Sequence, residues 1–181
     1  MKNLLLILAF VFFAGCSTKQ TFIALKEYVP SQSAKSAKKA IVIASVNDMR
    51  TNKDVIATIT STSGEISEYV VLNTDVATYF KNALLNELHS RGVSGGGENT
   101  IVANINITEF KANMSGYASD NTKASIKVVL NAIRGSETIT KNFADNQTKF
   151  ELIRTGSAFS PILKTMIDDM VKRVADGLIS L

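Results

Sequence analysis

The chain has 181 residues, of which 45% are hydrophobic, and it carries a formal net charge of +4 at pH 7. This length and composition are typical of one globular domain. The single Cys excludes a disulfide within the chain, and the dispersed basic residues argue against nucleic-acid binding. They favour a solvated, slightly basic surface, with weak attraction to anionic lipid headgroups as the alternative.

The chain opens with the pattern of a secretory signal. Lys2 is followed by an apolar run at residues 4–13 and by small residues before Cys16. The run is about half of the roughly 20 residues that a membrane-spanning helix requires. Residues 13–16, Phe-Ala-Gly-Cys, resemble a bacterial lipobox, although Phe13 stands where that motif more often has Leu. We therefore predict that Cys16 becomes the lipidated first residue of the mature protein.

The alternative is an ordinary signal peptide that is cut nearby and leaves Cys16 as a free thiol. Under the lipidation hypothesis, two or more acyl chains would anchor the protein stably to a membrane. Ser17, rather than Asp, follows the Cys. This favours the outer membrane, with the periplasmic face preferred and the cell surface as the alternative.

Three segments follow from this pattern. We expect residues 1–15 to be the signal peptide, residues 16–39 to be the lipidated N-terminus and a tether, and residues 40–181 to be a single α+β domain. Low complexity at residues 31–39 is typical of a linker. Residues 22–29 are too apolar for a linker, and we expect them to dock on the domain as an edge segment that stops at Pro30.

Strand signals fill the first part of the expected domain. The β-branched run at residues 40–46 predicts a central strand that is buried on both faces. Residues 55–60 and 66–72 predict two further strands, joined by a hairpin-like turn at residues 61–64. Residues 101–108 alternate between apolar and polar side chains, which predicts a strand with one buried face.

A first helix is expected between these strands. Asn73 or Thr74 can cap it, Asp75 falls in its first turn, and Gly92 follows its C-terminal end. Its predicted buried face repeats every four residues, at Val76, Phe80, Leu84 and Leu88. We expect this helix to form the crossover between the strand at residues 40–46 and the strand at residues 101–108.

The C-terminal part predicts two long strands and a second helix. Residues 112–121 resemble a polar turn, residues 124–134 alternate as a strand, and residues 137–152 return as a long polar strand, which favours antiparallel pairing. Ser160 is the expected cap of the last helix, with Pro161 at its first helical position. Together the elements predict an α+β fold, with a mixed, mostly antiparallel sheet and two helices packed on it.

Several features together resemble the YajG-type family of small bacterial lipoproteins, whose function is not established. They are the lipobox, the apolar segment that ends at Pro30, and a strand ending V-x-D-x-R, matched by Val46, Asp48 and Arg50. A capped helix and an alternating strand follow, so the resemblance covers roughly residues 16–110. The chain is also similar, more distantly, to accessory lipoproteins of envelope transport systems. The resemblance implies an envelope lipoprotein with an α+β domain and implies no catalytic residues.

Few residues qualify as a functional site. Asp48 and Arg50 could bind a partner or ligand at the end of their strand, and the alternative is a turn cap with a local ion pair. His89 is the only histidine, and without thiol or imidazole partners it makes a poor metal ligand or catalytic base. We therefore predict no catalytic residue, no metal site and no cofactor, and expect His89 at the surface.

Three functions are consistent with this pattern. The first is a non-enzymatic envelope lipoprotein that binds or supports other envelope proteins. The second is a surface-exposed adhesin or host-contact protein, with the polar strand at residues 137–152 as its contact edge. The third is an envelope hydrolase, which the lack of a credible base argues against. The sequence leaves the oligomeric state open.

Overall fold

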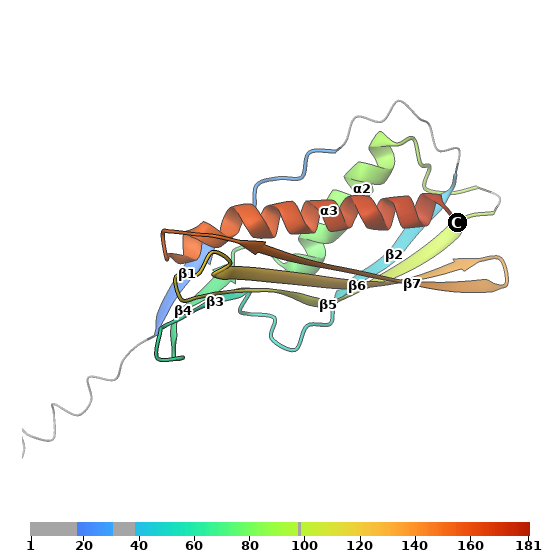
Figure 1. Ribbon diagram of the computed structural model, residues 1–181. Coiled ribbons are helices and arrows are strands. Elements are labelled where there is room, and N and C mark those ends of the chain that lie inside the picture. Colours follow the sequence, from blue (N-terminus) through green and yellow to red (C-terminus); the bar gives the residue numbers. More distant parts are fainter. Residues whose placement is uncertain (1–17, 31–38, 98) are drawn as a thin grey trace, which may run out of the picture.

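A seven-stranded sheet, covered on one face by two helices, forms the part of the chain that the structure describes (Figure 1). This computed structural model describes residues 18–30, 39–97 and 99–181. Cys16 and residues 31–38 of the predicted linker lie outside the described residues. The sheet is mixed and mostly antiparallel, so the predicted α+β fold is confirmed.

The strands and helices follow one another along the chain as β1 (Lys19–Ile23), β2 (Ile41–Asp48), β3 (Ala57–Thr60), β4 (Ile66–Leu72), α2 (Val76–Ser90), β5 (Ile101–Ser115), β6 (Thr122–Arg134), β7 (Glu137–Lys149), the 3-10 turn η2 (Gly156–Ala158) and α3 (Phe159–Ile179). The strand order is β1-β4-β3-β5-β6-β7, and β2 also pairs with β5.

Strand β5 is the central strand of the sheet. On one edge it pairs along its length with β6. On the other edge its first half pairs with β2 and its last four residues pair with β3, both in parallel. Its odd-numbered apolar residues from Ile101 to Ile107 are buried beneath the helices, while Asn104 and Asn106 lie on the uncovered face. One long strand thus aligns two shorter ones end to end.

The prediction of a central strand buried on both faces is wrong for residues 40–46. Among the described strands, β2 pairs only with β5. Ile41 and Ile43 are buried, but Ala44 is exposed. Farther along the same edge of β5, the pairing partner is β3 and not an extension of β2. The β-branched run therefore marks a strand at the side of the sheet.

The hairpin predicted at residues 55–72 is confirmed. Strands β3 and β4 are antiparallel, and Gly64 in their turn has φ +89°, a conformation that favours glycine. β2 and β5 are parallel neighbours, as expected of strands joined by a crossover. The connection between them contains this hairpin as well as α2.

Strand β5 extends beyond its predicted end. Residues 112–115, expected in a turn, continue the strand to Ser115, and the turn follows from Gly116. The pairing register shifts between Ile107 and Glu109, as in a β-bulge. Such an insertion moves the buried set from odd to even positions, so that Phe110 and Met114 face the core. Because the buried positions change from odd to even, the sequence pattern did not indicate that the strand continues beyond residue 108.

Helix α2 buries its predicted apolar face, and α3 also buries an apolar stripe, but the N-caps of both helices differ from those predicted. In α2 the N-cap is Asp75, whose side chain accepts from the backbone N–H of Thr78 at 2.7 Å. Gly92 ends this helix at φ +78°, as predicted. Helix α3 begins at Phe159, after the 3-10 turn, so Ser160 lies inside the helix instead of capping it.

Residues 18–30 belong to the folded body. Strand β1 lies at the edge of the sheet, parallel to β4. The following residues pass over α2, where Tyr28 is buried and the Tyr79 hydroxyl donates to the Lys26 carbonyl at 2.9 Å. The sheet thus contains residues upstream of residue 40, and the domain limits given above stay predictions.

Candidate functional site

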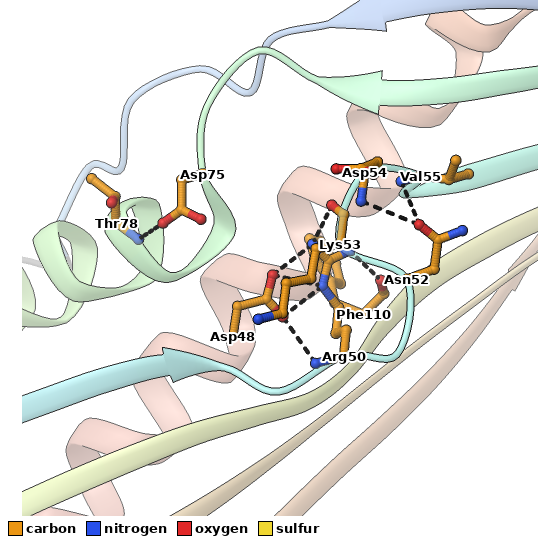
Figure 2. A network of polar contacts seen from close by, with 9 residues as sticks. All are labelled: Asp48, Arg50, Asn52, Lys53, Asp54, Val55, Asp75, Thr78 and Phe110. Carbon is orange, nitrogen blue, oxygen red and sulfur yellow. Dashed lines mark hydrogen bonds and ion pairs between the residues drawn. The ribbon is translucent and has the colours of Figure 1, made fainter.

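Asp48 and Arg50, which the sequence singles out, form a bidentate ion pair at the end of β2 (Figure 2). Arg50 Nη2 donates to Asp48 Oδ2 at 2.8 Å, and Arg50 Nε donates to Asp48 Oδ1 at 2.9 Å. The Arg50 backbone N–H also donates to Oδ1, at 3.1 Å. The two side chains are only 6% and 7% exposed. The local ion pair, which the sequence suggested as the alternative to partner binding, is therefore present.

Arg50 also holds the loop that follows β2. Its Nη2 donates to the Lys53 carbonyl at 2.9 Å, and its Nη1 donates to the Phe110 carbonyl of β5 at 3.3 Å. Asn52 accepts from the backbone N–H groups of Asp54 and Val55. Figure 2 shows these contacts converging on the turn between β2 and β3. The pair thereby fixes the path of residues 51–55 against the sheet.

The surroundings of Asp48 stabilise its charged form. Burial alone would raise the pKa of Asp48, but the hydrogen bonds from the side chain and backbone of Arg50, together with the nearby positive charges, lower it below its usual value. Both charges are thus satisfied inside the protein. Binding of a partner by Asp48 and Arg50 themselves stays a prediction.

A hollow of about 480 Å³ lies beside this loop, on the sheet face opposite the helices. Asn52 and Val55 of the loop form one wall, and side chains from β3, β5, β6 and β7 form the floor. We call it the sheet groove. Its polar floor residues alternate along their strands with buried or half-buried ones, and they are Thr58, Lys111, Asn113, Lys123, Ser125, Asn146 and Thr148.

Amides, hydroxyls and two lysines give the sheet groove its chemistry. Asn113 Nδ2 donates to the Thr58 hydroxyl at 2.9 Å and is fixed by it. Lys111 lies 3.1 Å from Glu109, and Lys123 lies 3.6 Å from Asp120, but both ammonium groups are well exposed. Most of the accessible lining is apolar, so the groove can offer apolar contact together with hydrogen bonds at a few polar positions.

The sequence missed a buried acid, Glu87 on α2. It is fully buried, and its Oε2 accepts from the Tyr28 hydroxyl at 2.6 Å. Arg91 Nε donates to Glu87 Oε1 at 2.7 Å, and Arg91 also pairs with Asp176 of α3. Burial, and next the hydrogen bond to Glu87, raise the pKa of Tyr28 well above its usual value. A signal was present, because Glu87 falls on the same helical face as Phe80 and Leu84.

The described ranges contain neither a cluster of metal-ligating side chains nor a helix suited to span a membrane. No three His, Cys, Asp or Glu side chains there lie close enough to hold a metal ion. His89 is exposed on α2. None of the helices in the same ranges is long and apolar enough to span a bilayer.

Known proteins resemble this chain in sequence pattern and in fold. A family model described as "Uncharacterized lipoprotein" matches residues 28–177. No curated protein sequence matches the chain. The crystal structure of a protein from Xanthomonas campestris, assigned to family-model DUF330, is similar with a TM-score of 0.62 and 9% identity, over 87% of this chain and 94% of that one.

Two further crystal structures are similar at low identity. An uncharacterized protein gives a TM-score of 0.57 at 11% identity, over 88% of this chain and 99% of that one. Rare lipoprotein B from Shewanella oneidensis gives 0.43 at 11% identity, over 74% and 92% of the two chains. The likenesses with TM-scores of 0.62 and 0.57 show that the fold is shared.

Proposed function

Because this chain belongs to a family of uncharacterized lipoproteins, in agreement with its YajG-type sequence features, we propose that it is a non-enzymatic lipoprotein of the bacterial envelope. Lipid on Cys16 anchors it to the outer membrane, on the periplasmic face. There it binds another envelope component through the sheet groove. The family match supports the lipoprotein identity, and the anchor, the membrane and the partner are proposals.

The uncovered sheet face is the observation that carries the binding proposal. A sheet face that is only exposed to solvent has no need of a concave pocket. Ligand-binding pockets in proteins commonly have volumes of about 300–1,000 Å³. The sheet groove has about 480 Å³. Its amides and hydroxyls suit an extended peptide or another polymer rich in hydrogen-bonding groups, and the exposed ammonium groups of Lys111 and Lys123 can donate hydrogen bonds to it.

The chemistry of the described residues favours binding over catalysis. The acids with the least exposed side chains are engaged: Asp48 with Arg50, Glu68 with Lys19, and Glu87 with Arg91. A nucleophilic hydroxyl needs a neighbouring base, and His89 lies at the surface of α2, away from the sheet groove. A hydrolase hypothesis would return if turnover were measured and lost in Asp48→Ala or His89→Ala.

The second candidate is a surface-exposed adhesin. Strand β7 ends the strand order, and the side chains of Glu137–Lys149 are exposed or half-buried throughout. An edge strand of this length could add a strand from another protein. Arg173 of α3 already donates to the Ala144 carbonyl, which occupies one acceptor on this strand.

Protease treatment of intact and permeabilised cells tests location. On the periplasmic proposal, only permeabilised cells lose the domain. Loss from intact cells would instead support the adhesin. Cys16→Ser is the control for the anchor, and a Cys16→Ser protein that still fractionates with membranes would contradict lipid anchoring.

Photo-crosslinking tests the groove. A photoreactive amino acid at exposed position 146 should form adducts with one envelope component. The double variant Lys111→Glu/Lys123→Glu should abolish them, whereas Lys81→Glu, an exposed lysine on α2, should not. Adducts that survive reversal of both groove lysines would overturn the assignment of the groove.

A further inference from the structure

One end of the sheet carries a cluster of exposed apolar side chains. Strands β1, β4 and β6 start at this end, and β3, β5 and β7 finish there. Figure 1 shows it opposite the end that carries the C-terminus. The cluster, here called the apolar end, draws on the β3–β4 hairpin, the β5–β6 turn and the segment after β7. Its five members are 41% to 76% exposed, namely Ile66, Tyr117, Phe150, Leu152 and Ile153.

Polar contacts fix the backbone beneath this cluster. Asn121 Nδ2 donates to the Glu151 carbonyl at 2.7 Å, and the Glu151 backbone N–H donates back to Asn121 Oδ1 at 2.9 Å. Arg154 lies 4.9 Å from the centre of the Tyr117 ring and donates to the Thr60 carbonyl at 2.6 Å. The turn and the segment after β7 are therefore joined, and they hold their apolar side chains outward.

The same end receives the chain from Cys16. Strand β1 begins at Lys19, beside Glu68 near the start of β4. Cys16 and Thr18, the first described residue, are two positions apart in the chain, and two steps along an extended chain span at most about 7 Å. A lipid on Cys16 would thus hold the apolar end close to the bilayer surface.

Resting on the proposed lipidation of Cys16, we propose that the apolar end inserts into the interfacial layer of the leaflet that holds this lipid. The strands then rise from the membrane, and the turn at Gly135 and Ser136 points away from it. Aliphatic side chains would enter the acyl boundary, and Tyr117 would lie at headgroup depth, where tyrosine is enriched. The anchor and the cluster would act together, as two membrane signals do.

The charges at this end favour insertion by apolar contact rather than by attraction to anionic lipid. Lys149 pairs with Glu151 at 2.6 Å, Lys123 with Asp120 at 3.6 Å, and Lys19 with Glu68 at 3.3 Å. Paired lysines offer little net charge to a lipid surface. Arg154 contacts Tyr117 and the Thr60 carbonyl and has no ion pair among the described residues, so one positive charge remains at this end. Insertion should therefore depend mainly on apolar contact and change little when anionic lipid is added.

A single-site probe tests this orientation. The acylated mature protein places its only Cys in the lipid anchor, so Leu152→Cys supplies a unique thiol for an environment-sensitive fluorophore. The matched control is Ser136→Cys, exposed at the opposite end. In phosphatidylcholine vesicles, a spin-labelled lipid should quench most of the fluorescence at position 152 and leave position 136 unchanged. The quenching should change little when phosphatidylglycerol is added.

The outcomes separate the two proposals. Mass spectrometry of the N-terminal peptide reports the acyl chains, and their absence overturns both the proposed anchor and the insertion. Acylated, vesicle-bound protein with an unquenched probe at position 152 overturns the insertion alone. A blue-shifted probe without lipid quenching, in particles of twice the protein mass, would assign the apolar end to a second copy of the chain instead.

Discussion

The Tyr28 hydroxyl donates to the buried Glu87 carboxylate at 2.6 Å, although the two residues are 59 positions apart in the chain. Arg91 binds the same carboxylate and reaches Asp176 on α3. One acid thereby joins the N-terminal segment, α2 and α3. Because a buried charge is stable only when it is paired and hydrogen-bonded, each of these contacts should contribute measurably to stability.

Removing the Tyr28 hydroxyl tests this junction. Tyr28→Phe keeps the ring but removes one hydrogen bond to a buried carboxylate, and it should lower the free energy of unfolding by about 1.5–3 kcal/mol. Urea unfolding measures the change. Tyr117→Phe is the matched control, since the Tyr117 side chain is 70% exposed, and it should change stability little. Equal effects of the two substitutions would contradict the role given to Glu87.

The Asp48–Arg50 pair should matter more than a surface ion pair. Arg50→Ala leaves Asp48 buried without its main partner, and we expect a loss of about 3–5 kcal/mol. Lys53→Ala, at an exposed position of the same loop, should cost far less. The double variant Asp48→Ala/Arg50→Ala should lose less than the sum of the two single variants. A strictly additive result would show that the pair does not act as a unit.

Because Asp48 and Glu68 are buried acids, we predict that the folded protein loses stability at low pH. Burial opposes the charged form of Asp48 and of Glu68, but hydrogen bonds outweigh it: those from Arg50 lower the pKa of Asp48, and those from Thr21, Gly156 and Lys19 lower the pKa of Glu68.

A lowered pKa in the folded state means that the unfolded chain binds protons first as the pH falls. The stabilisation is therefore complete above the ordinary pKa values, about 4, and is lost as the pH falls through the lower folded values. Urea unfolding at a series of pH values should show this decline, and it should be shallower in Asp48→Asn. An identical decline in wild type and variant would argue against the assignment.

Gly156 should tolerate no side chain. A Cβ built there would lie 2.6 Å from Glu68 Oε1 and 2.8 Å from Thr21 Cβ. Its backbone N–H also donates to Glu68 at 2.9 Å, so the approach is part of a contact. We expect Gly156→Ala to destabilise the protein by about 1–3 kcal/mol in thermal or urea unfolding. Gly95→Ala, where nothing lies within 4 Å of the added Cβ, should be close to neutral.

Features encoded locally were predictable from the sequence. The stripe from Val76 to Leu88 follows the helical period, and Gly64 and Gly92 occur where a turn and a helix end require positive φ. The position of β2 at the side of the sheet was not predictable in the same way. It depends on β3, which pairs with part of the same edge of β5. An edge segment was expected at residues 22–29, but the edge strand β1 spans Lys19–Ile23. Its first residues gave no strand signal because only Phe22 and Ile23 of the five are apolar, and its partner β4 is distant in sequence.

The same distinction holds for the candidate site. An ion pair between Asp48 and Arg50 was foreseeable because the residues are two positions apart. The acceptor at Phe110 was not, since it comes from a strand 60 positions later. The sheet groove combines a loop with four strands, so its lining follows from pairing registers that no local pattern encodes.

The parallel pairing of β1 with β4 has a mechanical consequence. Five residue pairs connect the strands in the same direction, from Lys19–Glu68 to Ile23–Leu72. With Cys16 fixed in a membrane, a force that pulls the body away acts along β1 and shears this ladder. Its hydrogen bonds then share the load, whereas in a hairpin pulled from its open end they would break one after another. If Cys16 carries lipid as we propose, β1 would form a shear-resistant attachment between the lipid and the domain.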